Sequence, residues 1–203
     1  MCEGAELILA SASAGRATVL RNAGLRFRQA PAAIDERALE AGMLARDGRL
    51  DAESLAAMLA SEKARAASGR NGQALVIGAD QVMECDGEIL HKPADRGAAR
   101  AQLRQLRGRT HNIYSAIAVA SAGETRWQHV DCARLTMRTF SDAFLDDYVA
   151  GEEDGLLLSV GCYRIEGRGI QLFSRVEGDH FTIIGLPLLP LLGYLRECGW
   201  LAS

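Results

Sequence analysis

In the stretch VIGADQVMECDGEILHKP, the carboxylate of Asp80 and the amine of Lys92 could act on the same substrate. Asp80 follows an apolar run at residues 75–77 and a Gly-Ala step. We therefore expect it at the end of a buried strand, at the sheet edge where α/β proteins usually hold their sites. A carboxylate there could bind a divalent metal or accept a proton from water. It could equally be a turn residue or N-cap that closes the bend, and spacing alone does not separate these roles.

Lys92 stands just beyond an Asp86-Gly87 pair, which is the strongest short signal for a β-hairpin. The hairpin would fold the chain back and return Lys92 to the neighbourhood of Asp80. Phosphate oxygens of a substrate would give both groups a reason to be there. Taken alone, a lysine near a turn is more often a solvated surface residue.

A second candidate site lies in the first turn between a strand and a helix, which holds Ser11, Ser13 and Arg16. Exposed N–H groups and the positive end of the helix dipole make such a turn a binding place for anions. Arg16 could add a bidentate grip on a phosphate. The same residues could also do no more than cap the helix. Glu36 and Lys63, taken alone, are ordinary surface residues.

Several common sites are excluded because their patterns are missing. There is no Gly-rich loop ending in Gly-Lys-Ser/Thr, which excludes a P-loop, and no Gly-x-Gly-x-x-Gly fingerprint. The histidines show no ligand spacing, so we expect no histidine zinc site. The cysteines are far apart and lack a Cys-x-x-Cys pair, so we expect no disulfide framework and a reducing cytosol. They are Cys2, Cys85, Cys132, Cys162 and Cys198.

The elements that must position these residues alternate between strands and helices. We expect a short strand, a polar turn and a helix that is capped by Ser13 and stopped near Gly24. A second helix should run from the cap Asp51 to Gly69. Residues 74–90 should form a strand, a bend, a second strand, the Asp-Gly turn and a third strand.

The rest of the chain continues this alternation. Residues 95–106 read as a helix, and residues 111–140 as two long strands around a turn at Ala122-Gly123. Ser141 should cap a helix through Tyr148, and a last helix should follow Pro187. Hairpin signals in the middle of an α/β pattern predict an α/β protein with a mixed sheet and flanking helices.

The composition favours one globular domain over residues 1–203. The chain of 203 residues is 48% hydrophobic and 24% charged, and its formal net charge of -3 argues against a stable nucleic-acid complex. The N-terminal segment does not resemble a secretory signal. The apolar stretch GLPLLPLLGYL is too short to span a bilayer and contains two prolines. We therefore expect a cytoplasmic protein that does not contact membranes.

Several motifs in one order then add a resemblance that covers the chain nearly end to end. LILASASAGRATVL, AIDE, SEKA, VIGADQV, GEILHKP, YRIEGRGIQLF and GDHFTIIGLPL resemble the Maf family of nucleoside triphosphate pyrophosphatases. The family was formerly described as septum-formation inhibitors. The order and spacing of these motifs in the chain are far more specific than any one motif. The resemblance implies an elongated mixed α/β fold, similar to that of inosine triphosphatases, with two lobes around a cleft and often dimeric.

The resemblance also implies roles for residues. Asp80 matches the family's proton-accepting aspartate, and Ser13 and Arg16 match the end of its Ser-Pro-Arg-Arg turn. Asp80 would activate water directly or through a divalent cation, Mg²⁺ or Mn²⁺. The family's other cleft residues match Glu36, which could complete the metal's oxygen shell, and Lys63 and Lys92, which with Arg16 would hold the triphosphate.

Three positions bear on the choice of base. A family member that prefers dTTP and UTP has Arg, Thr and Gln where this chain has Gly15, Gln81 and Glu166. The branch resembling 7-methylguanosine triphosphate pyrophosphatase has Trp, Gln and Glu, so two positions match it. A carboxylate at 166 can only accept, and the guanine edge offers two adjacent donors. Purine preference follows, although the missing Trp removes a stacking surface for a methylated base.

Two classes of function therefore follow from the sequence. The first is a metal-dependent enzyme that clears noncanonical or modified nucleotides and releases a monophosphate and pyrophosphate. The second is a nucleotide-sensing regulator of cell division without catalysis, which the replacement of the family's Pro-Arg by Ala14-Gly15 favours. His91 replaces a usual family glycine and could narrow the cleft. A nucleotide panel separates the two classes.

Overall fold

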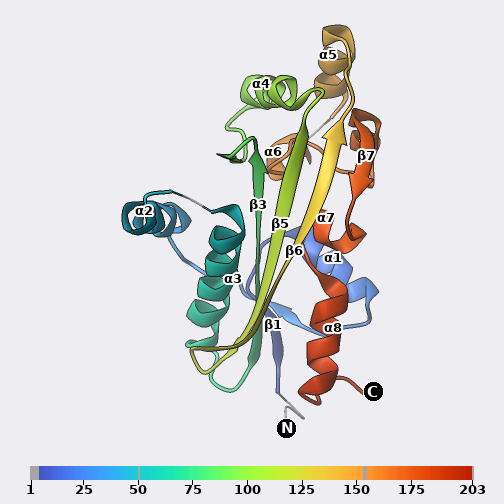
Figure 1. Ribbon diagram of the computed structural model, residues 1–203. Helices are drawn as coiled ribbons and strands as arrows, with labels where there is room; N and C mark the ends of the chain where they lie inside the picture. The colour runs from blue at the N-terminus through green and yellow to red at the C-terminus, as the bar shows by residue number, and fades with distance from the viewer. Residues whose placement is uncertain (1–4, 50, 153–154, 203) are drawn as a thin grey trace.

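The computed structural model describes residues 5–49, 51–152 and 155–202. Its centre is a seven-stranded sheet with the order β2-β1-β3-β5-β6-β7, and β4 pairs with β3 beside this path. Figure 1 shows an elongated molecule along which β3, β5 and β6 run lengthwise. The strands are β1 (Leu7–Leu9), β2 (Arg28–Gln29), β3 (Leu75–Cys85), β4 (Glu88–Leu90), β5 (Thr110–Ser121), β6 (Glu124–Met137) and β7 (Phe173–Glu177).

The helices begin where the sequence supplies capping side chains. Ser13, Asp51, Asp95 and Ser141 each accept a hydrogen bond from a backbone N–H of the first turn, as expected for N-caps. The helices are α1 (Ala14–Asn22), α2 (Glu36–Asp47), α3 (Ala52–Ser68), α4 (Arg96–Leu106), α5 (Asp142–Gly151), α6 (Gly155–Leu158), α7 (His180–Ile183) and α8 (Leu188–Glu197), with a 3-10 turn at Arg168–Leu172. The five predicted helices are confirmed.

The pairing of the strands makes the sheet mixed, as predicted. β1 runs parallel to both β2 and β3, whereas β3, β5, β6 and β7 pair antiparallel in succession. β5 and β6 form one long hairpin that turns at Ala122 and Gly123, both with positive φ angles of 53° and 82°. The chain therefore combines a parallel βαβ unit at one side with a meander at the other.

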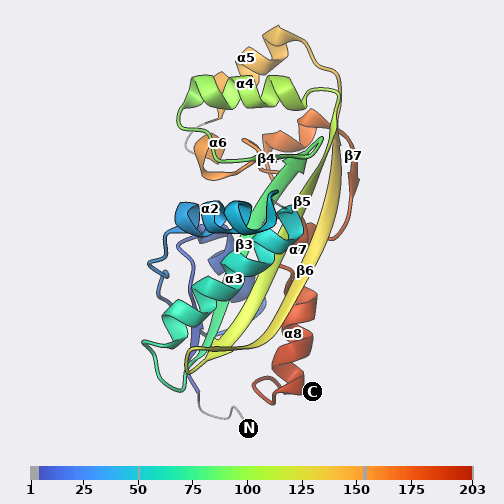
Figure 2. The same ribbon diagram turned by 60° about the vertical axis from the view of Figure 1, so that its left-hand side comes forward.

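The two faces of the sheet are covered by different helices (Figure 2). The alternating side chains of β3 divide accordingly, because successive residues of a strand point to opposite faces. Val82 packs with α3 on one face, in a cluster that includes Leu55 and Ala60. Ile77 packs with α1 and α8 on the other face, in a cluster that includes Leu20. The sheet is thus the middle layer of this part of the molecule.

A further hydrophobic cluster fills the opposite end of the molecule. It joins the far ends of β3, β5 and β6 to α4 and α5 through residues such as Met83, Leu103 and Tyr148. Figure 1 shows α4 and α5 above the ends of these strands, away from both termini. The predicted division into two lobes corresponds to these separate clusters at the two ends of a shared sheet.

One local prediction was wrong. We expected a bend near Asp80 and placed this residue at the end of a strand, whereas β3 continues without a break from Leu75 to Cys85. Its pairing with β5 is continuous from Val76 to Glu84. The backbone hydrogen bonds of this long ladder outweigh the local preference of Gly78 and Asp80 for a turn.

Two further predictions concern the cysteines and the membrane. Cys85, Cys132 and Cys162 are free thiols, and Cys2 lies outside the described residues. Within the ranges that the structure describes, no helix combines the length and the apolar character needed to cross a bilayer.

Candidate active site at the interrupted edge of β3

The candidate site lies where the sheet is interrupted beside β3. The pairing with β1 ends at Leu9 and Ile77, and one more backbone bond joins the N–H of Ala10 to the carbonyl of Ile77 at 2.8 Å. On the same side, β4 begins to pair only at Met83. Among the described residues, no strand pairs with this edge of β3 at residues 78–82. Asp80 lies inside this interruption.

The carboxylate of Asp80 lies on the α3 face of the sheet, where Lys63 contacts it and Glu36 contacts Lys63. Lys63 of α3 donates a short hydrogen bond to Oδ1 of Asp80, and its Nζ lies 2.9 Å from Oε1 of Glu36. The side chains of Lys63 and Asp80 are only 12% and 10% exposed, whereas that of Glu36 is 52% exposed. One ammonium group therefore lies between a buried and an accessible carboxylate.

The close packing of α3 on β3 explains why Lys63 reaches Asp80. A Cβ at Gly78 would lie 2.2 Å from the carbonyl oxygen of Ala60 and 2.6 Å from the backbone nitrogen of Ala64. Only glycine permits this approach of helix to strand. Lys63 lies on the turn of α3 that contacts Gly78. Because Gly78 lies two residues before Asp80 in β3, this contact brings Lys63 close to the carboxylate.

The side chain of Arg16 binds the edge of β3 where no strand pairs with it. Its Nη1 donates to the carbonyl of Ala79 at 2.8 Å, and its Nε donates to the carbonyl of Gly185 at 2.8 Å. Nη1 also lies 3.2 Å from Oγ of Ser11. Within the described residues, Nη2 has no protein acceptor. A guanidinium held by backbone carbonyls thus keeps two N–H groups for a ligand.

The charges of the site shift one another's pKa values. Burial raises the pKa of Asp80, although Lys63 and Arg16 each pull it down. Burial lowers the pKa of Arg16, and the charges of Asp80 and Glu36 partly offset this effect. A carboxylate whose pKa is raised by burial and that has cations beside it is typical of an acid–base site.

The first turn, between β1 and α1, is closed by two local hydrogen bonds. The Oγ of Ser13 accepts from the N–H of Arg16 at 3.3 Å, and the N–H of Ser13 lies 3.2 Å from Oγ of Ser11. Ser11 is buried, and Gly15 is exposed with space around it, because a Cβ there would meet only Oγ of Ser13 at 3.8 Å. The capping role of Ser13 is confirmed, and phosphate binding by this turn stays a prediction.

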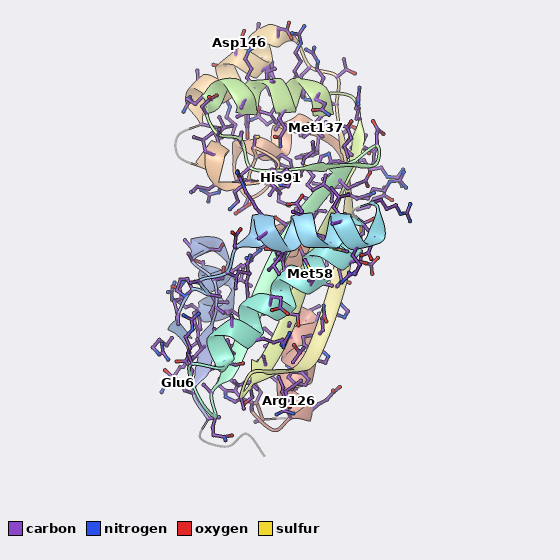
Figure 3. The ribbon with its side chains drawn as sticks, turned by 90° about the vertical axis from the view of Figure 1, so that its left-hand side faces the viewer. Glu6, Met58, His91, Arg126, Met137 and Asp146 are labelled. Carbon is purple, nitrogen blue, oxygen red and sulfur yellow. The ribbon has the colours of Figure 1, made fainter. Side chains whose placement is uncertain are left out.

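The β3–β4 hairpin carries Lys92 back along β3 as expected. The register pairs Met83 with Leu90, so an extension by two residues would set Lys92 opposite Gln81. The side chain of Lys92 is exposed, and no hydrogen bond or ion pair in the described structure joins it to Asp80. Nε2 of the neighbouring His91 lies 3.4 Å from Oε1 of Glu40 in α2. Figure 3 shows the labelled His91 between α2 and the end of the molecule that carries α4. Lys92 is thus near the interruption but is not part of the Asp80 cluster.

The three positions that bear on base choice lie in different surroundings. Gln81 is half-buried on the opposite face of the sheet from Asp80, and its Nε2 donates to carbonyls of α7. Glu166 is 43% exposed and has one loose ion pair, 3.7 Å from Nε of Arg164. Gly15 lies in the first turn of α1 and is exposed. The structure shows no direct contact among these three residues in the regions it describes.

The carboxylates can be tested for their fit to a divalent metal. Among the described residues, no group of three or more His, Cys, Asp or Glu side chains could hold a metal ion. Asp80 and Glu36, however, converge on a single cationic atom, the Nζ of Lys63. Mg²⁺ is commonly bound by one or two carboxylates together with substrate phosphates and water. In this structure the ammonium of Lys63 lies between the two carboxylates, and a metal held by them together with substrate oxygens stays a prediction.

Two surface hollows lie outside this cluster. One of about 520 Å³ is lined by polar groups at the far ends of β3, β5 and β6, including Glu84 and Arg109. The other, of about 200 Å³, lies beside Pro31 and Asn71. Their lining residues pair mainly with one another, as in the ion pair of Arg109 with Asp86 at 3.0 Å. The charged side chains around Asp80, and not the volume of a hollow, therefore identify the candidate site.

The sequence did not predict several groups that position the side chains of this site. These are the helix α2, which carries Glu36, the carbonyls of Ala79 and Gly185, which accept from Arg16, and Ser115 of β5, which accepts from Gln81. A signal for α2 was present, because Asp35 caps it and Gly48 ends it with a φ angle of 73°. The backbone carbonyls carried no signal, since every residue has one.

Comparison with known proteins adds a family and several relatives. Residues 6–198 match the family described as "Maf-like protein". A protein of Nitrobacter winogradskyi named nucleoside triphosphate pyrophosphatase is 51% identical over 197 residues, which are 97% of this chain and 95% of the relative. Two proteins named 7-methyl-GTP pyrophosphatase are 47% identical in Brucella abortus and 49% identical in Rhizobium meliloti; both alignments cover 95% of this chain and 96% of the relative.

Solved structures show weaker similarity. A dITP/XTP pyrophosphatase of Mycobacterium abscessus aligns with 95% of this chain and 97% of its own, with a TM-score of 0.40 and 14% sequence identity. The Ham1 protein of Staphylococcus aureus aligns with 68% of this chain and 72% of its own, with a TM-score of 0.37 and 15% identity.

Proposed function

The chain belongs to the family of Maf-like proteins, and from this membership we propose that it is a nucleoside triphosphate pyrophosphatase dependent on a divalent metal. The observation that supports the chemistry best is the carboxylate of Asp80 with Lys63 bonded to it and Arg16 beside it. A base and two cations at one place are what hydrolysis of a phosphoanhydride requires.

The proposed reaction adds water across the bond between the α and β phosphates. The carboxylate of Asp80 accepts a proton from the attacking water, whose oxygen forms a bond to the α phosphorus. The α–β bridging oxygen leaves with the pyrophosphate. The products are a nucleoside monophosphate and pyrophosphate. Burial raises the pKa of Asp80 and so makes its carboxylate a stronger base than an exposed one.

The cationic groups would hold the charge that develops on the phosphates. Lys63 lies against Asp80 and Glu36, and the free N–H groups of Arg16 project from a guanidinium fixed by two backbone carbonyls. Ser11, Ser13 and the N-terminus of α1 add donors, and Lys92 lies near enough along β3 to contribute a mobile cation. A bound Mg²⁺ or Mn²⁺, held by Asp80 and Glu36, would supply further charge neutralisation.

For the substrate we propose a purine nucleoside triphosphate, with 7-methyl-GTP as a candidate. Relatives at 47% and 49% identity bear the name 7-methyl-GTP pyrophosphatase. The carboxylate of Glu166 can only accept, which suits the N1–H and 2-amino donors of guanine. A pyrimidine-2,4-dione presents one donor between two acceptors, which a carboxylate disfavours. Gly15 leaves the methylated base without the aromatic surface of that branch.

We also propose a compartment and an oligomeric state for the enzyme. The widely spaced cysteines and modest net charge suit a cytoplasmic protein without a stable nucleic-acid complex. A homodimer follows from the family resemblance alone.

The test is a panel of 7-methyl-GTP, GTP, dTTP and UTP, each supplied with Mg²⁺ or Mn²⁺ and with a chelator in parallel. We expect the highest kcat/KM for a purine, release of pyrophosphate with the monophosphate, and loss of turnover with the chelator. Tight nucleotide binding in a calorimetric titration without release of pyrophosphate would favour the regulator. Failure of all four nucleotides to react would end the proposal.

A further inference from the structure

The side-chain amide nitrogen of Gln81 donates hydrogen bonds to a buried hydroxyl and two backbone carbonyls. Its Nε2 lies 3.0 Å from Oγ of Ser115, 3.3 Å from the carbonyl oxygen of Thr182 and 3.0 Å from that of Ile183. Oγ of Ser115 in turn donates to the carbonyl of Thr182 at 2.7 Å. Ser115 and Thr182 are fully buried.

This arrangement allows only one orientation of the amide. The carbonyl oxygens of Thr182 and Ile183 can only accept, and the one proton of the Ser115 hydroxyl is already used by Thr182. All three groups around Gln81 therefore present lone pairs. An amide oxygen turned toward them would face three acceptors without a donor, so the nitrogen must point inward.

The oxygen of the same amide then points away from the network. In the described structure Oε1 of Gln81 accepts no hydrogen bond, yet it is not among the buried polar atoms without partners. It is thus an accessible acceptor. A Cβ at Gly185 would lie 3.5 Å from Nε2 of Gln81 and 3.6 Å from Nε of Arg16, which places the amide beside the guanidinium of the site.

We propose that Ser115 is a positioning residue that holds the Gln81 amide so that Oε1 accepts a hydrogen bond from the base of the substrate. The proposal rests on the proposed function and deepens it. The guanine edge carries three donors in a row, N1–H and the two hydrogens of the 2-amino group. Glu166 offers two oxygens and Gln81 a third, so acceptors and donors match in number.

The experiment compares GTP with inosine triphosphate, which lacks only the 2-amino group. We expect the wild-type enzyme to prefer GTP in kcat/KM. Ser115→Ala removes one of the three acceptors that hold Nε2 and leaves the carbonyls of Thr182 and Ile183 in place. The amide is then held less firmly, so the preference should fall about two- to fivefold, mainly through a higher KM for GTP. Ser115→Thr keeps the hydroxyl and should keep most of the preference.

A second variant separates positioning from a general loss of structure. Gln81→Leu removes Oε1 and should lower the preference by a similar factor. Because Ser115 acts through Gln81, Ser115→Ala should then have no further effect on the ratio in the Gln81→Leu background. A purely structural role would reduce turnover of both nucleotides equally and leave the ratio unchanged.

The outcomes are distinguishable. An unchanged ratio in Ser115→Ala, an equal loss in Ser115→Thr, or a wild-type enzyme that hydrolyses both nucleotides equally well would each overturn the positioning role while the pyrophosphatase activity stands. If Ser115→Ala does not fold, Gln81→Leu still decides whether Oε1 contributes to the preference. Turnover of neither nucleotide by the wild-type enzyme would overturn the proposed function itself, and the positioning role with it.

Discussion

The single most informative residue is Asp80, because its carboxylate is buried in the middle of a strand and still has two cations beside it. A buried, unpaired carboxylate would be strongly destabilising, and Lys63 and Arg16 reduce that cost. The carboxylate has no role in the hydrophobic clusters and lies where the sheet lacks a strand. We therefore interpret it as the base of the reaction.

Asp80→Asn should lower kcat for pyrophosphate release by a factor on the order of 10² to 10⁴, because the amide cannot accept the proton of the attacking water. A steady-state assay with GTP and Mg²⁺ measures this change. Asp86→Asn is the matched control, since Asp86 lies on the turn after the same strand, is exposed and has a φ angle of 53° that asparagine tolerates. Full kcat in Asp80→Asn, or an equal loss in the control, would refute the assignment.

The residues of the site differ in how far the sequence could identify them. Asp80, Lys63, Glu36 and Arg16 were singled out from motifs, and the structure brings these four together. Ser115 was missed because a serine in an apolar strand has no local signal of its purpose. The carbonyl of Thr182 in α7, to which its hydroxyl donates, lies 67 residues away along the chain. Such contacts become visible only when the sheet and α7 are placed.

Among the elements, α3 is the one that positions the site. It crosses β3 at Gly78 so closely that a methyl group would collide with backbone atoms of Ala60 and Ala64. The same turn of α3 carries Lys63. The helix itself could be predicted from its cap and its apolar spacing, but its closeness to the strand could not, because this depends on where glycine meets alanine in space.

Gly78→Ala should destabilise the fold by about 1–3 kcal/mol or more, since the collision involves backbone atoms that cannot rotate away. It should also reduce activity, because α3 must move away from β3 and take Lys63 with it. Chemical denaturation and the GTP assay measure the two effects.

Gly193→Ala in α8 is the control for this substitution. A Cβ there would meet no atom within 4 Å, so alanine should stabilise the protein by about 0.4–1 kcal/mol and leave activity unchanged. Equal stability of Gly78→Ala and the wild type would show that the close approach does not matter.

At the scale of the whole molecule, β5 and β6 join the hydrophobic clusters of the two ends. Residues of β5 contribute to the cluster under α3, to that under α8 and to that under α4. The sequence predicted these long strands and the mixed sheet, because alternation and a turn signal are local. It did not predict which helices cover which end, since that depends on the connections after β6.

The buried His111 packs against the hydrophobic cluster below α4 and α5, through Tyr163 and Phe173, and makes the stability of the whole fold depend on pH. Nε2 of His111 lies 2.7 Å from the hydroxyl of Tyr163, and Nδ1 is buried without a partner in the described structure. Burial lowers the pKa of His111 from its ordinary value of 6.5 to about 4. Below pH 6.5 the unfolded chain binds a proton at this residue before the folded chain does.

Stability should therefore fall as the pH drops from about 6.5 to about 4, by up to about 3 kcal/mol, with no further loss from this residue at lower pH. Urea denaturation at several pH values measures this loss. His111→Gln should remove this part of the pH dependence, whereas His180→Gln, which changes an exposed histidine of α7, should keep it. The same slope in His111→Gln as in the wild type would show that other groups cause it.

The interruption beside β3 also has a consequence for the behaviour of the protein in concentrated solution. An unpaired strand edge is a template on which strands of other molecules can add, and proteins usually guard such edges. Here the guard is Arg16, which occupies the carbonyl of Ala79 and places a positive charge against any approaching backbone. The same side chain that is proposed to bind phosphate thus also protects the molecule against self-association.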